Sequence, residues 1–303
     1  MVNSNQQGED PRLLQSLNRR VFLKTAIATG ALAAAADGII FEPNHVQLTR
    51  LQIALARLPA AWEGVTIAQL SDFHYDDHFS VLPIRNAVDI VNKLHPDFIV
   101  LTGDFVTMPL LKTYLSGKKA AESIESCAPL LAKLEARHAV LAILGNHDSA
   151  SDPGRITENL QAYGILVLRN RSLAFEQAGH RLWFSGLDDV LEGEPDLDAT
   201  LRQIPKSEPN ILLAHEPDYA DSASRYPVDL QLSGHSHGGQ IRFPLIGPPY
   251  LPPLATKYPR GLRRIRDLTL YTNVGIGTIR VPVRFDCPPE LTLFILRRAT
   301  PNR

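Results

Sequence analysis

Short hydrophobic runs that each end in a polar cluster recur along the chain from residue 65 onward. The first three are residues 65–70, 98–101 and 139–144. Each is rich in β-branched residues or leucine and is followed by a turn signal, a pattern typical of buried strands. Between them, residues 82–94 and 120–136 carry apolar side chains at helical spacing. The alternation of strand and helix predicts an α/β fold.

The second half of the chain is richer in strand-like pieces. These are residues 166–168, 182–186, 211–214, 230–233, 268–273 and 291–296. Two sheets packed between helices accommodate this order of elements. We expect one catalytic domain over residues 60–300, because a chain of 303 residues holds one sizeable core with an appendage.

The N-terminal forty residues differ from the remainder. A polar start is followed by two adjacent arginines, Arg19 and Arg20, and then by an alanine-rich apolar stretch over residues 25–36. This is the layout of an export signal, which we place at residues 1–40. An apolar run of about twelve residues is too short for an ordinary membrane-spanning helix, which needs about 20. An amphipathic first helix is disfavoured, because Ala31–Ala36 presents no polar face.

The segment around the two arginines resembles a twin-arginine signal, since Arg20 is followed by Val21-Phe22-Leu23-Lys24, although Asn18 stands where Ser or Thr is usual. The resemblance implies the twin-arginine export machinery as a partner, which carries folded proteins with their cofactors. It also implies export across a bacterial cytoplasmic membrane, to the periplasm or the cell-wall side. The product is soluble if the signal is cut and anchored if it is not, and contact with a membrane surface stays open.

The net charge and the spacing of the cysteines argue against some classes of partner and of structural site. The 31 basic and 32 acidic side chains nearly cancel, so no chain-wide field favours nucleic acid. Cys127 and Cys287 lie far apart, which argues against a zinc knuckle or a disulfide scaffold and favours two buried small side chains. The sequence leaves the oligomeric state open.

The polar clusters that follow the predicted strands carry the candidate chemistry. In open α/β sheets, ligands gather at the carboxyl ends of strands. The ligand candidates at these ends are Asp72, His74, Asp104, Asn146, His215, His235 and His237. This nitrogen and oxygen set lacks thiolate and suits Mn, Zn or Fe better than Ca or Mg. Seven ligands fit two divalent ions that share one carboxylate.

The clusters also form an ordered series. The pattern D-x-H, G-D, G-N-H-D, a lone H, and G-H-x-H runs over residues 72–237. In this series the chain resembles the calcineurin-like metallophosphoesterase family. The resemblance implies an α/β sandwich of two mixed β-sheets flanked by helices, with the active site at the C-terminal ends of the strands. It further implies two divalent metal ions and a phosphoester substrate.

The family pattern assigns a role to each position. Asp72, His74 and His237 would hold the first ion, Asp104 would bridge, and Asn146, His215 and His235 would complete the second site. His147 would act on the leaving group, and Asp148 would orient the His147 ring. One departure is Thr107, where the family often has Asp; this position supports the ligands and is not one itself.

Segments beyond the basic pattern resemble a bacterial branch of exported or membrane-associated phosphoesterases, the branch of the YkuE and YaeI proteins. They are residues 234–240, 275–277 and 281–290. This branch favours a phosphodiesterase acting on an envelope or lipid-linked phosphate. The alternatives are a phosphomonoesterase of the same fold and a non-catalytic metal-binding envelope protein. The proline-rich residues 243–253 form either a rigid surface loop or an apolar lip beside the site.

Overall fold

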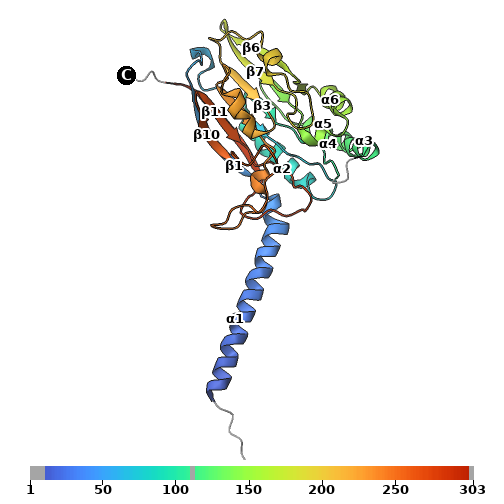
Figure 1. Ribbon diagram of the computed structural model, residues 1–303, viewed down its shortest axis with the longest axis vertical. Helices are drawn as coiled ribbons and strands as arrows, with labels where there is room; N and C mark the ends of the chain where they lie inside the picture. Colours follow the sequence, from blue (N-terminus) through green and yellow to red (C-terminus); the bar gives the residue numbers. More distant parts are fainter. Residues whose placement is uncertain (1–10, 110–112, 300–303) are drawn as a thin grey trace, which may run out of the picture.

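Two mixed β-sheets pack face to face in the computed structural model, which describes residues 11–109 and 113–299 (Figure 1). Six strands form each sheet within these residues. In spatial order, the first sheet is β1 (Gln47–Leu55), β12 (Glu290–Arg298), β2 (Thr66–Leu70), β3 (Phe98–Leu101), β4 (Ala139–Ala142) and β5 (Leu166–Val167). The second is β10 (Gly261–Ile265), β11 (Leu268–Thr272), β9 (Leu230–Ser233), β8 (Asn210–Leu213), β7 (His180–Gly186) and β6 (Arg171–Gln177).

Both sheets combine parallel and antiparallel pairs. In the first sheet, β12 runs antiparallel to β2, and the other neighbours are parallel. In the second, β11, β9, β8 and β7 are parallel to one another, with β10 and β6 antiparallel at the two edges. The predicted sandwich of two mixed sheets is therefore confirmed.

Alternating side chains of the central strands supply separate layers of the core. On β3, Phe98 and Val100 face the layer between the sheets, whereas Ile99 and Leu101 face the helices. This period of two is expected for a strand buried on both faces. The helices beside the first sheet are α2 (Val81–Leu94), α3 (Tyr114–Glu122), α4 (Ile124–Leu131), α5 (Asn146–Ser149) and α6 (Pro153–Ala162). Those beside the second are α7 (Leu197–Leu201) and α8 (Ala220–Ala223).

Three strands that the sequence analysis did not predict all lie at sheet edges. They are β1, β6 and β10. Edge strands bury few side chains, so their hydrophobic signal is weak: on β1 only Ile53 and Leu55 are fully buried. Because β1 pairs with β12 along its whole length, the sheet begins upstream of residue 60, where the sequence analysis started the domain. The helix expected over residues 120–136 is also divided, at Ser123, into α3 and α4.

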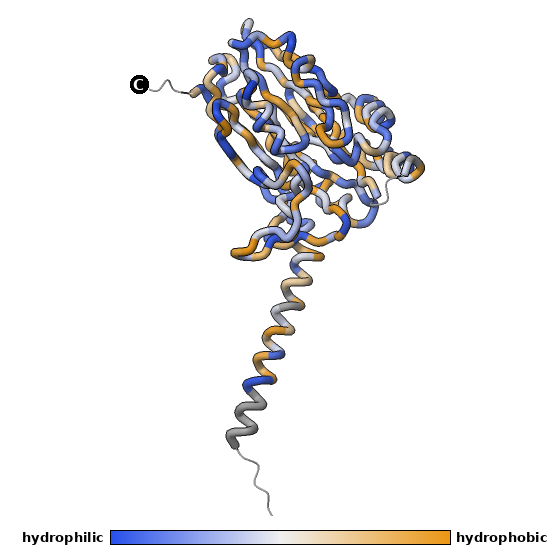
Figure 2. The backbone as a smooth tube through the Cα atoms, in the orientation of Figure 1, coloured by the Kyte–Doolittle hydropathy of each residue, from blue (hydrophilic) through white to orange (hydrophobic). Residues whose placement is uncertain are grey.

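The N-terminal helix α1 (Pro11–Ala36) stands away from the domain (Figure 1). It continues through a π-helical turn (Asp37–Phe41) and a 3₁₀ turn (Glu42–Asn44), so apolar residues extend past Ala36 (Figure 2). The segment Arg19–Asn44 is long and apolar enough to cross a membrane. The expectation that this stretch is too short is wrong, because the helix does not end with the alanine tract. An export signal and a membrane anchor both satisfy this criterion of length.

Candidate metal centre

The five predicted polar clusters meet at one end of the sandwich. Three of them follow β2, β3 and β4, which are neighbours in the first sheet. The other two follow β8 and β9, which are neighbours in the second. All five strands end at this site with their carboxyl ends, where parallel strands present their loops.

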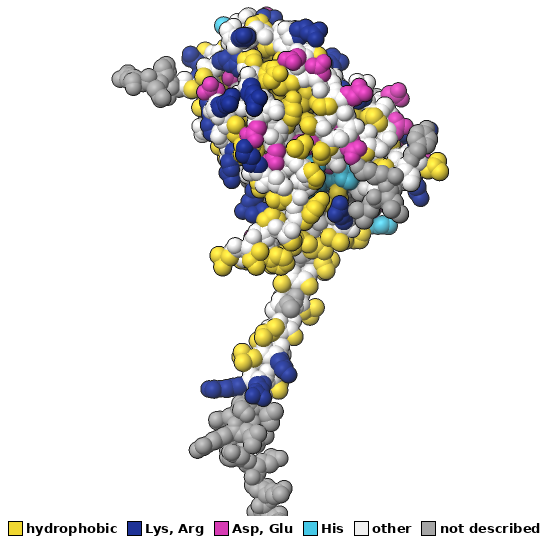
Figure 3. All heavy atoms as spheres, in the orientation of Figure 1, with side chains coloured by type: hydrophobic (Ala, Val, Ile, Leu, Met, Phe, Trp, Pro, Cys, Tyr) yellow, Lys and Arg dark blue, Asp and Glu magenta, His cyan; other side chains and the backbone are white. Residues whose placement is uncertain are grey.

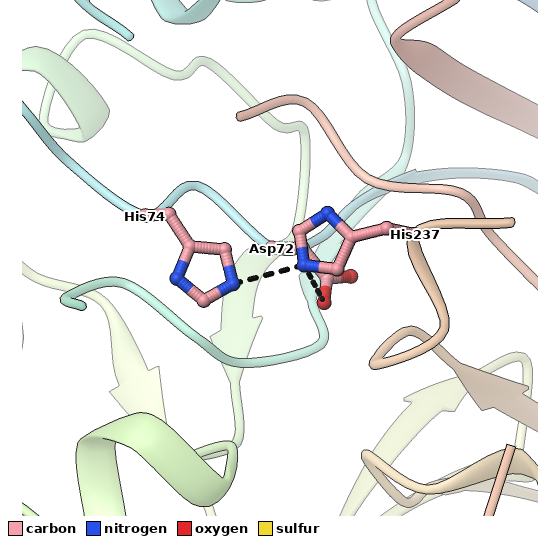
Figure 4. Close-up of side chains that lie close together, drawn as sticks. All are labelled: Asp72, His74 and His237. Carbon is pink, nitrogen blue, oxygen red and sulfur yellow. Dashed lines mark hydrogen bonds and ion pairs between the residues drawn. The ribbon is translucent and has the colours of Figure 1, made fainter. Parts of the chain in front are cut away.

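Asp72, His74 and His237 form the first group of side chains (Figure 4). The Nε2 atoms of His74 and His237 lie 2.9 Å apart, and His237 Nε2 lies 3.4 Å from Asp72 Oδ1. All three residues are buried. Two neutral imidazole nitrogens approach this closely either by sharing one proton or by directing lone pairs at a common cation.

Asp104, His215 and His235 form the second group. Asp104 Oδ2 lies 3.2 Å from His215 Nε2 and 3.4 Å from His74 Nε2. One carboxylate oxygen therefore faces imidazoles of both groups, which is the position of a bridging ligand. Asn146 belongs beside this group, because the N–H of the next residue, His147, donates to Asp104 Oδ1 at 2.9 Å.

Hydrogen bonds on the far side of the rings fix which nitrogens face the site. His215 Nδ1 donates to the carbonyl of Thr102 at 2.6 Å, and His235 Nε2 donates to the carbonyl of Pro253 at 2.9 Å. A carbonyl only accepts, so the other nitrogen of each neutral ring keeps its lone pair. Such bonds orient metal-binding histidines and fix their tautomer.

Thr107 supports His74 in the same way. Its Oγ1 lies 3.2 Å from His74 Nδ1, on the side of the ring away from Asp104. The hydroxyl therefore stands where the family often has a carboxylate. The sequence analysis left this support open, and only the folded loop shows that threonine provides it.

Burial dominates the pKa values of the site. It lowers the pKa of His74 and of His235 to about 3 and raises that of Asp72 to about 6. Burial opposes the charge on His215 as well, but the Asp104 carboxylate outweighs it and raises the pKa of His215 well above its usual value. Conversely, burial is outweighed at Asp104, where His215 holds the carboxyl pKa well below its ordinary range. Burial thus keeps the rings of His74 and His235 neutral, as cation binding requires, whereas the Asp104 carboxylate favours the charged form of His215.

The residues present fit a pair of divalent cations. Asn146 Oδ1 is buried and has no hydrogen-bond partner among the residues that the structure describes. A buried acceptor without a partner is costly, and a cation would satisfy it. The ligand set also mixes nitrogen and oxygen without thiolate.

Backbone strain marks the same residues. Five of the seven predicted ligands have positive φ angles, which non-glycine residues rarely adopt: Asp72 (51°), His74 (42°), Asp104 (56°), His235 (68°) and His237 (49°). Such strain persists only where the surrounding structure enforces it, and it clusters at functional sites. These backbone angles therefore lower the local stability of the loops, and they direct the side chains toward one another.

His147 lies at the rim of the two groups. One of its ring nitrogens lies within 4.8 Å of ligand atoms of His74 and Asp104, and the ring is partly exposed. The backbone N–H of Met108 donates to His147 Nδ1 at 2.8 Å, so the neutral ring carries its proton on Nε2.

Asp148 is fully buried behind this loop. The sequence analysis expected it to orient the His147 ring, and this role stays a prediction. Its carboxylate accepts backbone N–H groups from Phe105, Val106 and Gly145 at 2.9–3.1 Å. It joins the loop after β3 to the loop after β4, and it influences His147 through the position of that backbone. Burial raises the pKa of Asp148 to about 8.

Sequence reasoning found no chemistry for residues 275–290, yet they brace the site. Ile276 N–H donates to the Ser71 carbonyl at 2.9 Å, and Gly277 N–H donates to the Asp72 carbonyl at 2.8 Å. A Cβ atom on Gly275 would lie 2.6 Å from Asp72 Cβ, so only glycine fits there. The fully buried Arg284 holds this segment through its carbonyl groups. No residue-type pattern signals these contacts.

The fold and the paired ligand groups define a class of phosphoesterase with a metal centre. The family model for the calcineurin-like phosphoesterases matches residues 65–239, and the chain belongs to this family. It is 36% identical over 292 residues to the uncharacterized metallophosphoesterase YkuE of Bacillus subtilis, covering 94% of this chain and 99% of the relative.

Two further relatives carry more specific names. Phosphodiesterase YaeI of Escherichia coli is 30% identical over 288 residues, covering 92% of this chain and 99% of the relative. The UDP-2,3-diacylglucosamine pyrophosphatase LpxG of Chlamydia trachomatis is 26% identical over 307 residues, covering 83% and 89% of the two chains. The family expected from the sequence is thus confirmed, with YkuE and YaeI among the relatives.

Proposed function

We propose that this protein is a phosphoester hydrolase with two divalent ions, chosen among Mn, Zn and Fe, and that it acts as a phosphodiesterase on an envelope or lipid-linked phosphate. The observation that carries the proposal is the position of Asp104, whose Oδ2 lies 3.4 Å from His74 Nε2 and 3.2 Å from His215 Nε2. A single carboxylate oxygen shared by two ligand groups is the arrangement that a dinuclear centre requires.

Asp72, His74 and His237 would hold one ion, and Asn146, His215 and His235 the other, with Asp104 between them. When bound, two such ions lower the pKa of a water and neutralise charge on the phosphate oxygens. Met108 keeps the His147 proton on Nε2, so the ring is a donor at the rim of the site. We assign the Nε2–H of His147 to donate a hydrogen bond to the departing ester oxygen and to stabilise the negative charge that develops on it. Asp148 holds the two loops that position this ring.

The preference for a diester rests on the relatives. One is named a phosphodiesterase, and another a pyrophosphatase of a diacylated sugar nucleotide. Both of these names describe phosphorus carrying two substituents. A phosphomonoesterase would use the same ligands, so the rim of the site decides between the two.

Metal analysis and turnover test the centre together. We expect purified protein to hold about two divalent ions per chain and to hydrolyse bis-p-nitrophenyl phosphate faster than p-nitrophenyl phosphate. Asp104→Asn should lose metal and activity together. His147→Gln should keep metal but lose about 10²- to 10⁴-fold in kcat, and His180→Gln, at an exposed histidine on β7, is the matched control.

Each negative result of these assays would contradict a different part of the proposal. Faster cleavage of the monoester would replace the diesterase assignment with a monoesterase. Bound metal without turnover on any ester would favour a non-catalytic metal-binding envelope protein. If His147→Gln kept full turnover, the assignment of the hydrogen-bond donor would be wrong.

We also propose that Arg19 and Arg20 direct the chain to the twin-arginine machinery. The support is the paired arginines at the start of an apolar helix. Replacing both arginines with lysine keeps the charge and should leave the protein in the cytoplasm on cell fractionation. Unchanged export of this variant would show that another route carries the protein.

A further inference from the structure

Large apolar side chains are exposed at the end of the domain where α1 joins it. The loop after the last metal-binding cluster presents Phe243, Leu245 and Ile246, which are 46%, 109% and 83% exposed. Tyr250, in the same loop, is half-exposed, and so is Val281, whose carbonyl accepts from Gln240 Nε2 at 3.0 Å. Ile39–Phe41 are exposed at the end of the helix. Figure 3 shows hydrophobic side chains gathered around this junction. Concentrated apolar exposure of this kind marks an interaction surface.

The backbone of this loop keeps these apolar side chains exposed. Residues 243–247, which we call the apolar tip, close a tight turn in which Gly247 N–H donates to the Phe243 carbonyl at 2.8 Å and Phe243 N–H donates back at 2.9 Å. Leu245 has a φ of 67°, a strained angle for a leucine. The turn thus fixes the most exposed side chain at its outermost point.

Hydrogen bonds connect the apolar tip to the end of α1. Arg242 N–H donates to the Phe285 carbonyl at 2.8 Å, and Arg284 N–H donates to the Gly38 carbonyl at 2.9 Å. Residues 283–285 therefore lie between the helix end and the start of the loop. Gly38 is itself buried against them, which fixes the helix end beside the domain.

We infer that the apolar tip, with Tyr250, Val281 and Ile39–Phe41, docks on the lipid bilayer that α1 enters. Because Arg19–Asn44 is long and apolar enough to cross a membrane, a bilayer around this helix would meet the domain at the junction. Interfacial segments combine aliphatic side chains with aromatic and basic ones. Here Arg280 lies over the Tyr250 ring, with 5.4 Å from its guanidinium carbon to the ring centroid.

The same loop touches the metal centre. It starts directly after His237 and returns to Pro253, whose carbonyl accepts from His235 Nε2 at 2.9 Å. Arg242 Nη1 also donates to the carbonyl of Gly238 at 2.6 Å. Docking would therefore hold the site close to the headgroup layer, whichever phosphoester it cleaves.

Depth-dependent fluorescence quenching tests this surface in the full-length chain. Leu245→Trp protein would be reconstituted into phosphatidylcholine and phosphatidylglycerol vesicles, with and without bromine on the acyl chains. A tryptophan about 5–10 Å inside the headgroup and acyl boundary should lose roughly half of its emission to the bromines. Ile246→Trp should behave alike, and both sites are exposed enough to accept the larger ring.

Two comparisons make the measurement specific. The unsubstituted chain gives the background of Trp62 and Trp183, which are both buried. Tyr163→Trp, at a half-exposed residue at the end of α6, is the control that should escape quenching. Equal quenching at residues 163 and 245 would overturn the proposal. Blue-shifted emission of Leu245→Trp without quenching would also overturn it, because a second protein copy would then cover the tip.

Discussion

Arg284 offers the sharpest test of how the later segments sustain the metal centre. Its guanidinium is fully buried, and its hydrogen bonds within the described part of the chain all go to backbone carbonyls. Nε donates to Gly277 at 3.2 Å, Nη1 to Cys287 at 2.9 Å, and Nη2 to Val274, Gly275 and Gly277 at 3.1, 3.1 and 2.6 Å. Replacing Arg284 by Met keeps most of the volume but leaves these four carbonyls without this donor.

The expected loss follows from these bonds. Hydrogen bonds to a charged group contribute about 1.5–3 kcal/mol each, and burial, which lowers the pKa of Arg284, offsets a large part of that gain. Breaking a buried charged network by removing one member typically costs about 3–5 kcal/mol. We therefore expect Arg284→Met to lower the free energy of unfolding by about 3–5 kcal/mol.

Urea unfolding of metal-free, detergent-solubilised full-length protein measures this difference without the contribution of bound ions. Arg85→Met, at an exposed arginine on α2, is the matched control and should stay within about 0.5 kcal/mol of the parent. Metal titration of the folded Arg284→Met protein should show about tenfold weaker binding, because residues 276 and 277 hold the backbone of Asp72. An Arg284→Met protein as stable as the control would refute the bracing role.

Three further changes test other parts of the structure. Thr107→Val removes the hydroxyl beside His74 Nδ1 and should weaken metal binding about 10- to 100-fold, as measured by titration; unchanged affinity would show that the hydroxyl does not support the ring. Gly275 has a φ of 79°, and Gly275→Ala places a methyl group against Asp72, so it should lower both metal content and thermal stability. The control is Gly179→Ala, at an exposed glycine that also has a positive φ, which measures the cost of the backbone angle alone. A chain that starts at residue 37 should keep a cooperative thermal transition, whereas one that starts at residue 60 lacks β1 and should not; equal melting of the two would show that β1 is dispensable.

The central strands were predictable because each is buried on both faces. A run such as residues 98–101 has no polar position, so its hydrophobic signal survives without any knowledge of the fold. On the edge strand β10 no side chain is buried, as in a surface loop. Its strand conformation comes from pairing with β11. Its structure therefore depends on a partner that the local sequence does not contain.

The candidate ligands could be found in the sequence for a different reason: a metal centre requires particular residue types at particular spacings. What could not be predicted is the bracing around them. Thr107, Gly275 and Arg284 act through a hydroxyl, an absent Cβ and a set of backbone carbonyls, and each of these depends on segments distant in the chain. Residue type alone assigns none of them a role.

The strained ligand backbones explain why this bracing is extensive. A non-glycine residue in the left-handed region costs about 1–3 kcal/mol, and Asp72, His74, Asp104, His235 and His237 all lie there. Isolated loops would relax to ordinary angles and turn these side chains away from one another. The hydrogen bonds from residues 276 and 277, and those that Asp148 accepts, prevent this relaxation. The arrangement of the candidate metal centre is thus a property of the whole sandwich, although its proposed ligands can be found in a few short motifs.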